Sequence, residues 1–432
     1  MRNRIFVLML TIFFVGITTT FAQEKVSLTL KEAREYAWEH NRTLKNASLE
    51  VKKAEAIRWQ ALATMLPQVS GSIEYNNMFG YSMDLGEFQI SMPNSINYSG
   101  RASVSFSGAQ LISVQLENIS KEMANISHDQ TEDEVADQVK ILYYSALVLE
   151  KTTDLLEKNL KNLQYLLTLT QKSVEVGIAE QTDADKIEVQ VASMETNVNS
   201  TKRSLEMAYN SLRLQLGLDV DSEIELTQTI EELMDAERAM ALLDADFMLD
   251  NNYDYQLMQQ NVKLAEKQLS LKKWQYAPSI TAFYQYTEKD YLSDEQTMNS
   301  TPPNMFGLTL NIPVFSSGSR YKAVKEAKFN YEQKANLLDD TRESLIIQHR
   351  QLRYNLKSNY ETYQTQVKNL VVVQRVFDNM SRKYEQGVAS SLDVTNSGSE
   401  LISAQNTYVQ ALLEVVNAQI ELEKLLNAQM YD

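Results

Sequence analysis

Two stretches of the chain, residues 109–176 and 319–386, contain neither glycine nor proline over 68 residues each. Each stretch lies between two glycines: Gly108 and Gly177 for the first, Gly318 and Gly387 for the second. Glycine and proline are the residues that most readily interrupt a helix, so each stretch is predicted to form one continuous helix. At about 1.5 Å per residue such a helix is on the order of 100 Å long, which is unusual for a globular enzyme.

Apolar residues recur along the second stretch at spacings of four or seven residues. They are Tyr331, Leu338, Leu345, Leu352, Leu356, Tyr363, Leu370, Phe377 and Tyr384. This spacing is typical of the seam along which two helices pack as a coiled coil. We therefore expect each long helix, at about 109–176 and 319–386, to pack against a shorter helix that follows it, at about 182–216 and 391–428.

The sequence also repeats itself at an offset of 210 or 211 residues. Matched pairs along the chain are Asn41 and Asn252, Pro67 and Pro278, Tyr144 and Tyr354, Asp183 and Asp393, and Leu216 and Leu426. Matched prolines and glycines are not expected from helical composition alone. The pattern predicts two structural repeats, residues 23–217 and 252–432, joined by an equatorial connecting segment at 218–251.

Between each proline window and the next long helix, the apolar period changes from helical to two. Alternation is clearest at Val69, Gly71, Ile73 and Tyr75, and again at Phe306, Leu308, Leu310 and Ile312. It predicts β-hairpins at about 68–107 and 279–315, with loops at 76–97 and 287–303. Strands of about ten residues with one apolar face are typical of transmembrane β-strands. Hairpins packed on a soluble core are the alternative.

Four strands cannot form a complete membrane structure, because open edges leave backbone N–H and C=O groups unpaired in lipid. The sheet must then close between copies of the chain. Eight strands from a dimer or twelve from a trimer are the smallest closed arrangements of this kind. Homo-oligomerisation is therefore expected.

Composition excludes several classes of function. The net charge of −16 argues against a nucleic-acid partner, and the absence of cysteine excludes disulfides and Cys-ligated zinc. The three histidines, His40, His128 and His349, are isolated in helical stretches. No phosphate-binding loop or nucleophile motif is present. We predict no catalytic residues, no cofactor and no metal, so the chain is not expected to be an enzyme.

The first residues are typical of a secretory signal peptide. Arg2 and Arg4 precede a short apolar run, and Ala22 ends a small-residue cleavage site. Residues 1–22 are therefore expected to be removed on export.

Taken together, these features resemble the TolC-type outer-membrane efflux family. The resemblance rests on the opening Leu28–Ala33, with a capping box at Thr29 and Glu32, on the run Ile312–Gly318, and on Tyr384–Gly387 with Leu392–Val394. It implies a mainly α fold in which duplicated helical hairpins form a periplasmic tunnel. Four β-strands per chain would contribute to a twelve-stranded transmembrane β-barrel in a homotrimer. The expected location is the cell outer membrane, extending into the periplasm and in contact with outer-membrane lipid.

The same resemblance assigns roles to residues at the hairpin tips. Gly177 and Gly387 are expected to contact a periplasmic adaptor protein. Asp183, Tyr384 and Asp393 are candidates for a gate at the periplasmic mouth. N-capping of the returning helices is the alternative for both aspartates. The sequence departs from the family's best-known gate at Ala389, where an arginine is usual, and at Asn396, where an aspartate is usual.

The sequence thus favours a passive exit duct of a tripartite efflux or type I secretion system. Such a duct would dock on an adaptor and an inner-membrane transporter. The alternative is a soluble periplasmic coiled-coil scaffold or adhesin without pore activity.

Overall fold

The computed structural model describes residues 25–84, 86, 89–230, 241–292 and 302–427. The predicted signal peptide at 1–22 lies outside them. The described residues form two compact units. We call the first the hairpin unit, which draws on residues within 1–42, 134–245 and 352–424. We call the second the sheet unit, which draws on residues within 43–133, 246–351 and 425–432. Each unit therefore contains residues from both halves of the sequence.

The main elements follow the same order twice. The first set is α3 (Arg42–Ala63), β2 (Gln68–Asn76), β5 (Ser95–Phe106), α4 (Gly108–Glu175) and α5 (Gln181–Leu216). The second set is α8 (Tyr253–Trp274), β7 (Ser279–Tyr291), β8 (Asn304–Asn311), α9 (Ser319–Glu385) and α10 (Ser391–Leu426). Helices α3 and α8 both have 22 residues, and α5 and α10 both have 36. The predicted mainly helical fold with long helical hairpins is confirmed.

The hairpin unit opens with a short strand and a capped helix. Strand β1 (Lys25–Leu28) pairs in parallel with β6 (Glu223–Leu226), an arrangement that the sequence did not indicate. Helix α2 (Leu30–His40) follows, and its capping box is formed as expected: the Thr29 N–H donates to Glu32 Oε2 over 2.8 Å, and the Glu32 N–H donates to Thr29 Oγ1 over 3.2 Å. The backbone N–H groups of Thr29 and Glu32, which have no partner within the helix, are thereby hydrogen-bonded.

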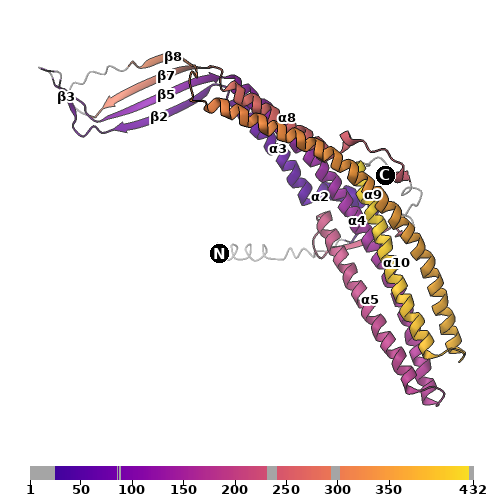
Figure 1. The fold of residues 1–432 in the computed structure, drawn as a ribbon. Coiled ribbons are helices and arrows are strands. Elements are labelled where there is room, and N and C mark those ends of the chain that lie inside the picture. The colour runs from indigo at the N-terminus through magenta and orange to yellow at the C-terminus, as the bar shows by residue number, and fades with distance from the viewer. Residues whose placement is uncertain (1–24, 85, 87–88, 231–240, 293–301, 428–432) are drawn as a thin grey trace, which may run out of the picture. The chain divides into compact units, whose positions relative to one another are not determined.

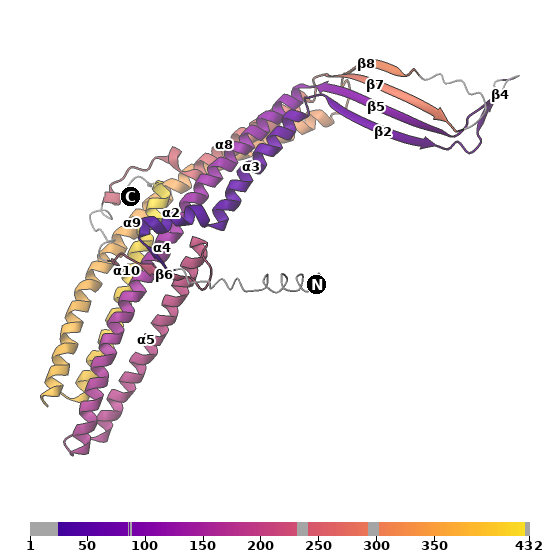
Figure 2. The ribbon, with the colours of Figure 1, turned by 180° about the vertical axis from the view of Figure 1, so that it is seen from behind.

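Four helices of the hairpin unit, α4, α5, α9 and α10, run side by side (Figure 2). Two apolar clusters hold the unit together. In the first, the ring of Tyr143 is fully buried, and its hydroxyl donates to the Leu28 carbonyl over 2.9 Å. The second contains Leu163, Met194, Phe377 and Leu401, one from each of the four helices. Of the predicted apolar seam of α9, Phe377 belongs to this second cluster, and Leu370 and Tyr384 pack against it.

The sheet unit contains one antiparallel sheet with the order β2-β5-β7-β8 (Figure 1). Its register places alternate residues on opposite faces. One face carries apolar side chains that are all exposed: Val69, Ile73, Tyr75, Tyr98, Val104, Phe106, Ile280, Tyr284, Tyr286, Phe306, Leu308 and Leu310. The other face carries polar pairs such as the Ser72 and Ser99 hydroxyls, 2.7 Å apart. An apolar face of this extent indicates a surface that is covered in the working protein.

Two of the predicted boundaries in the sheet are wrong. Strand β7 continues through Thr287 to Tyr291, where a loop was expected, because β5 offers pairing partners as far as Ser95, opposite Tyr291. Strand β8 ends at Asn311 rather than near residue 315, in keeping with Pro313, which has no N–H to donate. A small hairpin of β3 (Ser82–Asp84) and β4 (Gln89–Ser91) also lies in the predicted 76–97 loop.

In the part of the chain that the structure describes, none of the helices has both the length and the apolar character needed to cross a membrane.

Candidate functional site

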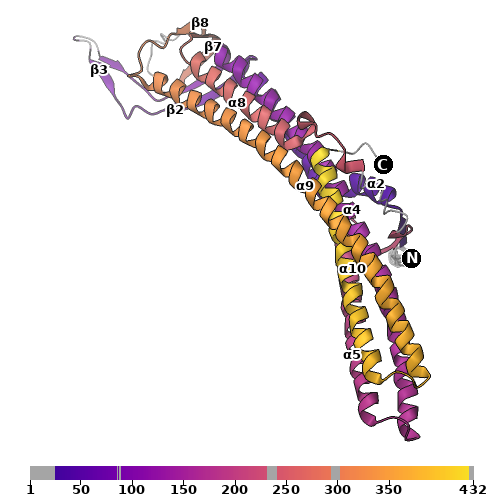
Figure 3. The ribbon, with the colours of Figure 1, turned by 45° about the vertical axis from the view of Figure 1, so that its right-hand side comes forward.

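The two helical hairpins of the hairpin unit turn at the same end of the bundle (Figure 3). In the first turn, Gly177 has φ +75°, its N–H donates to the Val174 carbonyl, and the Ile178 N–H donates to the Ser173 carbonyl over 2.8 Å. Glycine adopts this left-handed conformation without steric cost, which makes it the usual residue after a helix C-terminus.

The second turn repeats this geometry. Gly387 has φ +71°, its N–H donates to the Tyr384 carbonyl, and the Val388 N–H donates to the Lys383 carbonyl over 2.8 Å. Both turns also expose an apolar side chain directly after the glycine, with Ile178 82% and Val388 73% exposed. Two equivalent apolar tips therefore lie at one end of the unit.

Asp183 joins the two hairpins to each other. Its Oδ1 accepts a hydrogen bond of 2.5 Å from the Ser391 hydroxyl, which belongs to the first turn of α10. Asp183 also accepts a longer bond from the Glu180 N–H, as a capping residue would. The bond from Ser391 is the main reason that the pKa of the Asp183 carboxyl lies below its usual value.

Tyr384 makes a second connection between the hairpins. Its hydroxyl lies 2.6 Å from the hydroxyl of Thr170, which is completely buried in α4. The Thr170 hydroxyl already donates to the Leu166 carbonyl, so Tyr384 is the donor in this pair. A buried tyrosine hydroxyl usually finds such a partner.

In the described structure, Asp393 forms hydrogen bonds with Ser390, three residues earlier in the chain. Its Oδ2 accepts from both the hydroxyl and the N–H of Ser390, over 2.7 and 2.9 Å, and its own N–H donates back to the Ser390 hydroxyl. These bonds lower the pKa of the Asp393 carboxyl, and the bond from the Ser390 hydroxyl has the largest effect. The three gate candidates thus differ, since two connect the hairpins and one caps its own helix.

Three further residues at this end were not singled out from the sequence: Thr170, Gln190 and Ser391. The Ser399 hydroxyl donates to Gln190 Oε1 over 3.3 Å, which adds a third connection between the two hairpins and the second between α5 and α10. Their polar side chains within an apolar seam could have marked these residues in the sequence. Their hydrogen-bond partners could not be predicted, because these depend on how the two hairpins align.

Among the described residues, one group has ligand atoms placed closely enough to hold a metal ion. It consists of His128, Asp129 and Glu132 on α4, whose ligand atoms lie within 4.8 Å of one another. His128 was expected to be isolated, but Asp129 and Glu132 lie within about one helix turn of it. All three remain open to solvent in part, and nothing else in their surroundings points to an ion, so we propose no metal site there.

A family model described as "Outer membrane efflux protein" matches residues 34–218 and 246–428. The chain belongs to the outer membrane efflux protein family. The two matched segments together cover most of the chain and include both tips. Membership places this efflux-family chain in the outer membrane, with a part that extends into the periplasm. The family consists of transport proteins rather than enzymes.

Curated relatives of this efflux-family chain share limited sequence identity with it. The probable efflux pump outer membrane protein TtgC and the antibiotic efflux pump outer membrane protein ArpC, both of Pseudomonas putida, are each 22% identical over 290 residues. The alignment covers 67% of this chain and 60% of each relative. The chain therefore spans less than two thirds of the length of these relatives.

Solved structures share the fold more completely. The CmeC outer membrane channel of Campylobacter jejuni has a TM-score of 0.77 at 13% identity, covering 93% of this chain and 87% of that one. The MtrE outer membrane channel of Neisseria gonorrhoeae has a TM-score of 0.74 at 16% identity, covering 92% and 88%. A structure of CusC has a TM-score of 0.75 at 17% identity, covering 96% and 95%. The fold of the efflux-family chain is thus that of these channels.

Proposed function

We propose that the chain is the outer-membrane exit duct of a tripartite efflux or type I secretion system. In this proposal three copies form a passive conduit, and no residue changes the cargo chemically. The observation that carries the proposal is the four-stranded sheet, with its exposed apolar face and its two edge strands.

The edge strands β2 and β8 run in opposite directions, because three antiparallel pairings separate them. β8 of one copy can therefore pair antiparallel with β2 of the next copy. Three copies would give one closed sheet of twelve strands, an even number, in which every edge has a partner. The apolar face would then contact the hydrocarbon and the polar face would line a water-filled lumen.

The helical hairpins would continue this lumen into the periplasm. α4 with α5, and α9 with α10, supply two hairpins per copy, and six in a trimer. Their tips would dock on a periplasmic adaptor protein, which links the duct to an inner-membrane transporter. Support for this role comes from the exposed Ile178 and Val388, held outward by the turns at Gly177 and Gly387.

The gate proposal concerns the same end of the bundle. With threefold symmetry, Asp183, Tyr384 and Asp393 would each occur three times around the periplasmic mouth. The bonds from Ser391 to Asp183 and from Tyr384 to Thr170 support a mouth that is held closed when the two hairpins of one copy stay together.

The cargo class is proposed by analogy with the relatives. The name of ArpC refers to antibiotics, so we propose small molecules as cargo, with secreted proteins as the alternative. Selection of the cargo would belong to the transporter rather than to this chain.

Disulfide cross-linking between copies tests the closed sheet directly, because the chain has no cysteine of its own. Ser70→Cys on β2 is combined in turn with Met305→Cys, Thr309→Cys or Asn311→Cys on β8, all on the polar face. We expect one of these combinations to give cross-linked dimers and trimers and nothing larger. As a matched control, Ser103→Cys on the central strand β5 replaces Ser70→Cys and should give no cross-link between copies.

Absence of cross-links in all three registers would contradict the closed sheet. So would a ladder of products that continues beyond three copies. A chain that remains monomeric in water without detergent would favour the soluble scaffold instead.

A further inference from the structure

The polar face of the sheet carries a cation near the middle of the inner strand β5. Arg101 lies directly opposite Ser70 of β2 and Gln285 of β7, so these three residues share the polar face. We call a set of residues that lie opposite one another across the strands a level. The Arg101 side chain is exposed. A cation at this position contrasts with the net charge of −16 on the whole chain.

Arg101 packs on an aromatic ring rather than on a carboxylate. Its guanidinium carbon lies 4.2 Å from the centre of the Phe283 ring, a contact that stabilises a cation. Gly307 of β8, directly opposite Phe283, makes room for the ring, because a Cβ at Gly307 would overlap it. Among the residues that the structure describes, no carboxylate forms an ion pair with Arg101. The Arg101 charge is therefore held in place but remains available to other groups.

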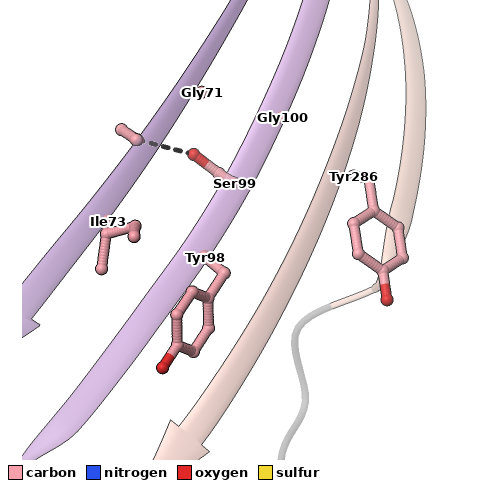
Figure 4. Close-up of a pocket in the computed structure, with 7 residues that line it drawn as sticks. Gly71, Ile73, Tyr98, Ser99, Gly100 and Tyr286 are labelled. Carbon is pink, nitrogen blue, oxygen red and sulfur yellow. Dashed lines mark hydrogen bonds between the residues drawn. The ribbon is translucent and has the colours of Figure 1, made fainter.

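The surroundings of Arg101 on the polar face are uncharged. At the next level away from α4, the Ser72 and Ser99 hydroxyls lie 2.7 Å apart (Figure 4). From Arg101 to the strand ends beside the helices, this face of β2, β5, β7 and β8 has only uncharged side chains. Its other ionisable residues, Glu74 and Lys289, share one level about 13 Å away, where their charges balance. The middle of the polar face thus has a net positive charge.

We propose that Arg101 is an anion site, and that it draws small molecules with a carboxylate or another negative group into the lumen. The inference rests on the proposed duct, in which three copies place three Arg101 side chains at one level of the lumen. Rings of arginine or lysine favour anions in pores. The site therefore assigns a charge preference to this chain, in addition to the selection that the transporter performs.

Ion selectivity of single channels tests the proposal. The reversal potential of the full-length protein is measured in a planar bilayer with a gradient of potassium benzoate. Arg101→Gln should lower the permeability of benzoate relative to potassium about threefold, as expected for a unit charge about 6 Å away in water. Arg101→Lys keeps the charge and should match the wild type. The control Glu74→Gln/Lys289→Gln removes the balanced pair and should also match the wild type.

Thiol modification tests the same charge without conduction. The chain has no cysteine, so Ser70→Cys places a single thiol directly opposite Arg101. Its reaction rate with a sulfonate-bearing methanethiosulfonate is divided by its rate with a trimethylammonium-bearing one, in detergent. This ratio cancels any change in the reactivity of the thiol itself. Adding Arg101→Gln should lower the ratio about tenfold, because the lost charge attracted one reagent and repelled the other.

The outcomes distinguish the anion site from the duct. If channels open but Arg101→Gln matches the wild type in the benzoate gradient, the anion site is overturned and the duct remains. A thiol ratio that Arg101→Gln leaves unchanged overturns the anion site whether or not channels open. If no channel opens while the thiol ratio falls as expected, the duct is contradicted and the positive charge on the polar face is retained. Thermal unfolding of each variant checks that the sheet has formed.

Discussion

The Asn41 side chain donates from Nδ2 to the Gln215 carbonyl over 2.7 Å, and its counterpart in the second half, Asn252, donates to the Leu425 carbonyl over 3.5 Å. Both asparagines are buried, with 3% and 8% exposed. The accepting carbonyls lie in the last turns of α5 and α10, where helix carbonyls lack partners within the helix. Each asparagine thus donates a hydrogen bond to a carbonyl in the last turn of a helix, more than 170 positions away in sequence.

Replacement of Asn41 by alanine should destabilise the hairpin unit. The Gln215 carbonyl, which is partly buried, would lose its partner, and this costs about 1 kcal/mol. Chemical denaturation in detergent measures the effect. Asn46→Ala, on the exposed surface of α3, is the control and should change stability by less than about 0.5 kcal/mol. Equal stability of the two variants would show that the Asn41 bond contributes nothing.

The ion pair between Lys140 of α4 and Glu423 of α10 gives a second prediction. Lys140 Nζ lies 2.6 Å from Glu423 Oε2, and the two side chains are only 8% and 10% exposed. Lys140→Met should cost about 3–5 kcal/mol, because it leaves a carboxylate buried without its cation. The double variant Lys140→Met/Glu423→Met should recover most of that loss.

A matched control for the ion pair is available on the surface. Lys202 lies 2.6 Å from Glu157, with exposures of 52% and 38%. Lys202→Met should cost about 1 kcal/mol or less, because solvent screens this pair. A double Met variant of the buried pair that is no more stable than the single one would contradict the assignment.

The connections at the hairpin tips give a prediction about the gate. Ser391→Ala removes the donor to Asp183, and Tyr384→Phe removes the donor to Thr170. Single-channel recording of the double variant should show larger or more frequent openings than the wild type. Thr182→Ala, which removes only an exposed local bond to Glu180, is the control. Currents that match the wild type in the double variant would exclude a gating role for these connections.

Acid should weaken the same region. The folded-state pKa values of Asp183 and Asp393 lie below 3.8, the usual value for aspartate. A carboxyl with a lowered pKa contributes stability above its unfolded pKa, and this is lost as the pH falls through the folded pKa. We therefore expect the tip contacts to persist at neutral pH and to weaken only below about pH 3.8.

Conductance measured as a function of pH checks this expectation. The double variant Asp183→Asn/Asp393→Asn should lack the acid-induced increase that the wild type shows. An increase centred near neutral pH, or one that persists in the double variant, would assign the transition to other groups.

Much of the fold was predictable because helix breakers are local signals. Gly108 and Gly318 mark the start of α4 and α9 to within a residue, and Gly177 and Gly387 mark their ends. Strand faces were also predictable, since a period of two has the same meaning wherever it occurs. The parallel pairing of β1 with β6 was missed, because four-residue strands carry little periodicity and their partners lie far apart in sequence.

The candidate site was predictable only in part. Asp183, Tyr384 and Asp393 were selected from the sequence, and the tip glycines were explained by their turn geometry. Their partners were not, because the contacts of Ser391 and Thr170 depend on the alignment of two hairpins that are separate in the sequence. No periodic pattern specifies that alignment, so contacts between the hairpins require the structure.

Single-channel conductance of the purified chain in a planar lipid bilayer tests the central claim most directly. A duct made of three copies predicts discrete current steps of uniform size, carried by a species whose mass is that of a trimer. A preparation that inserts no conducting species, while its helices remain folded, would contradict the claim.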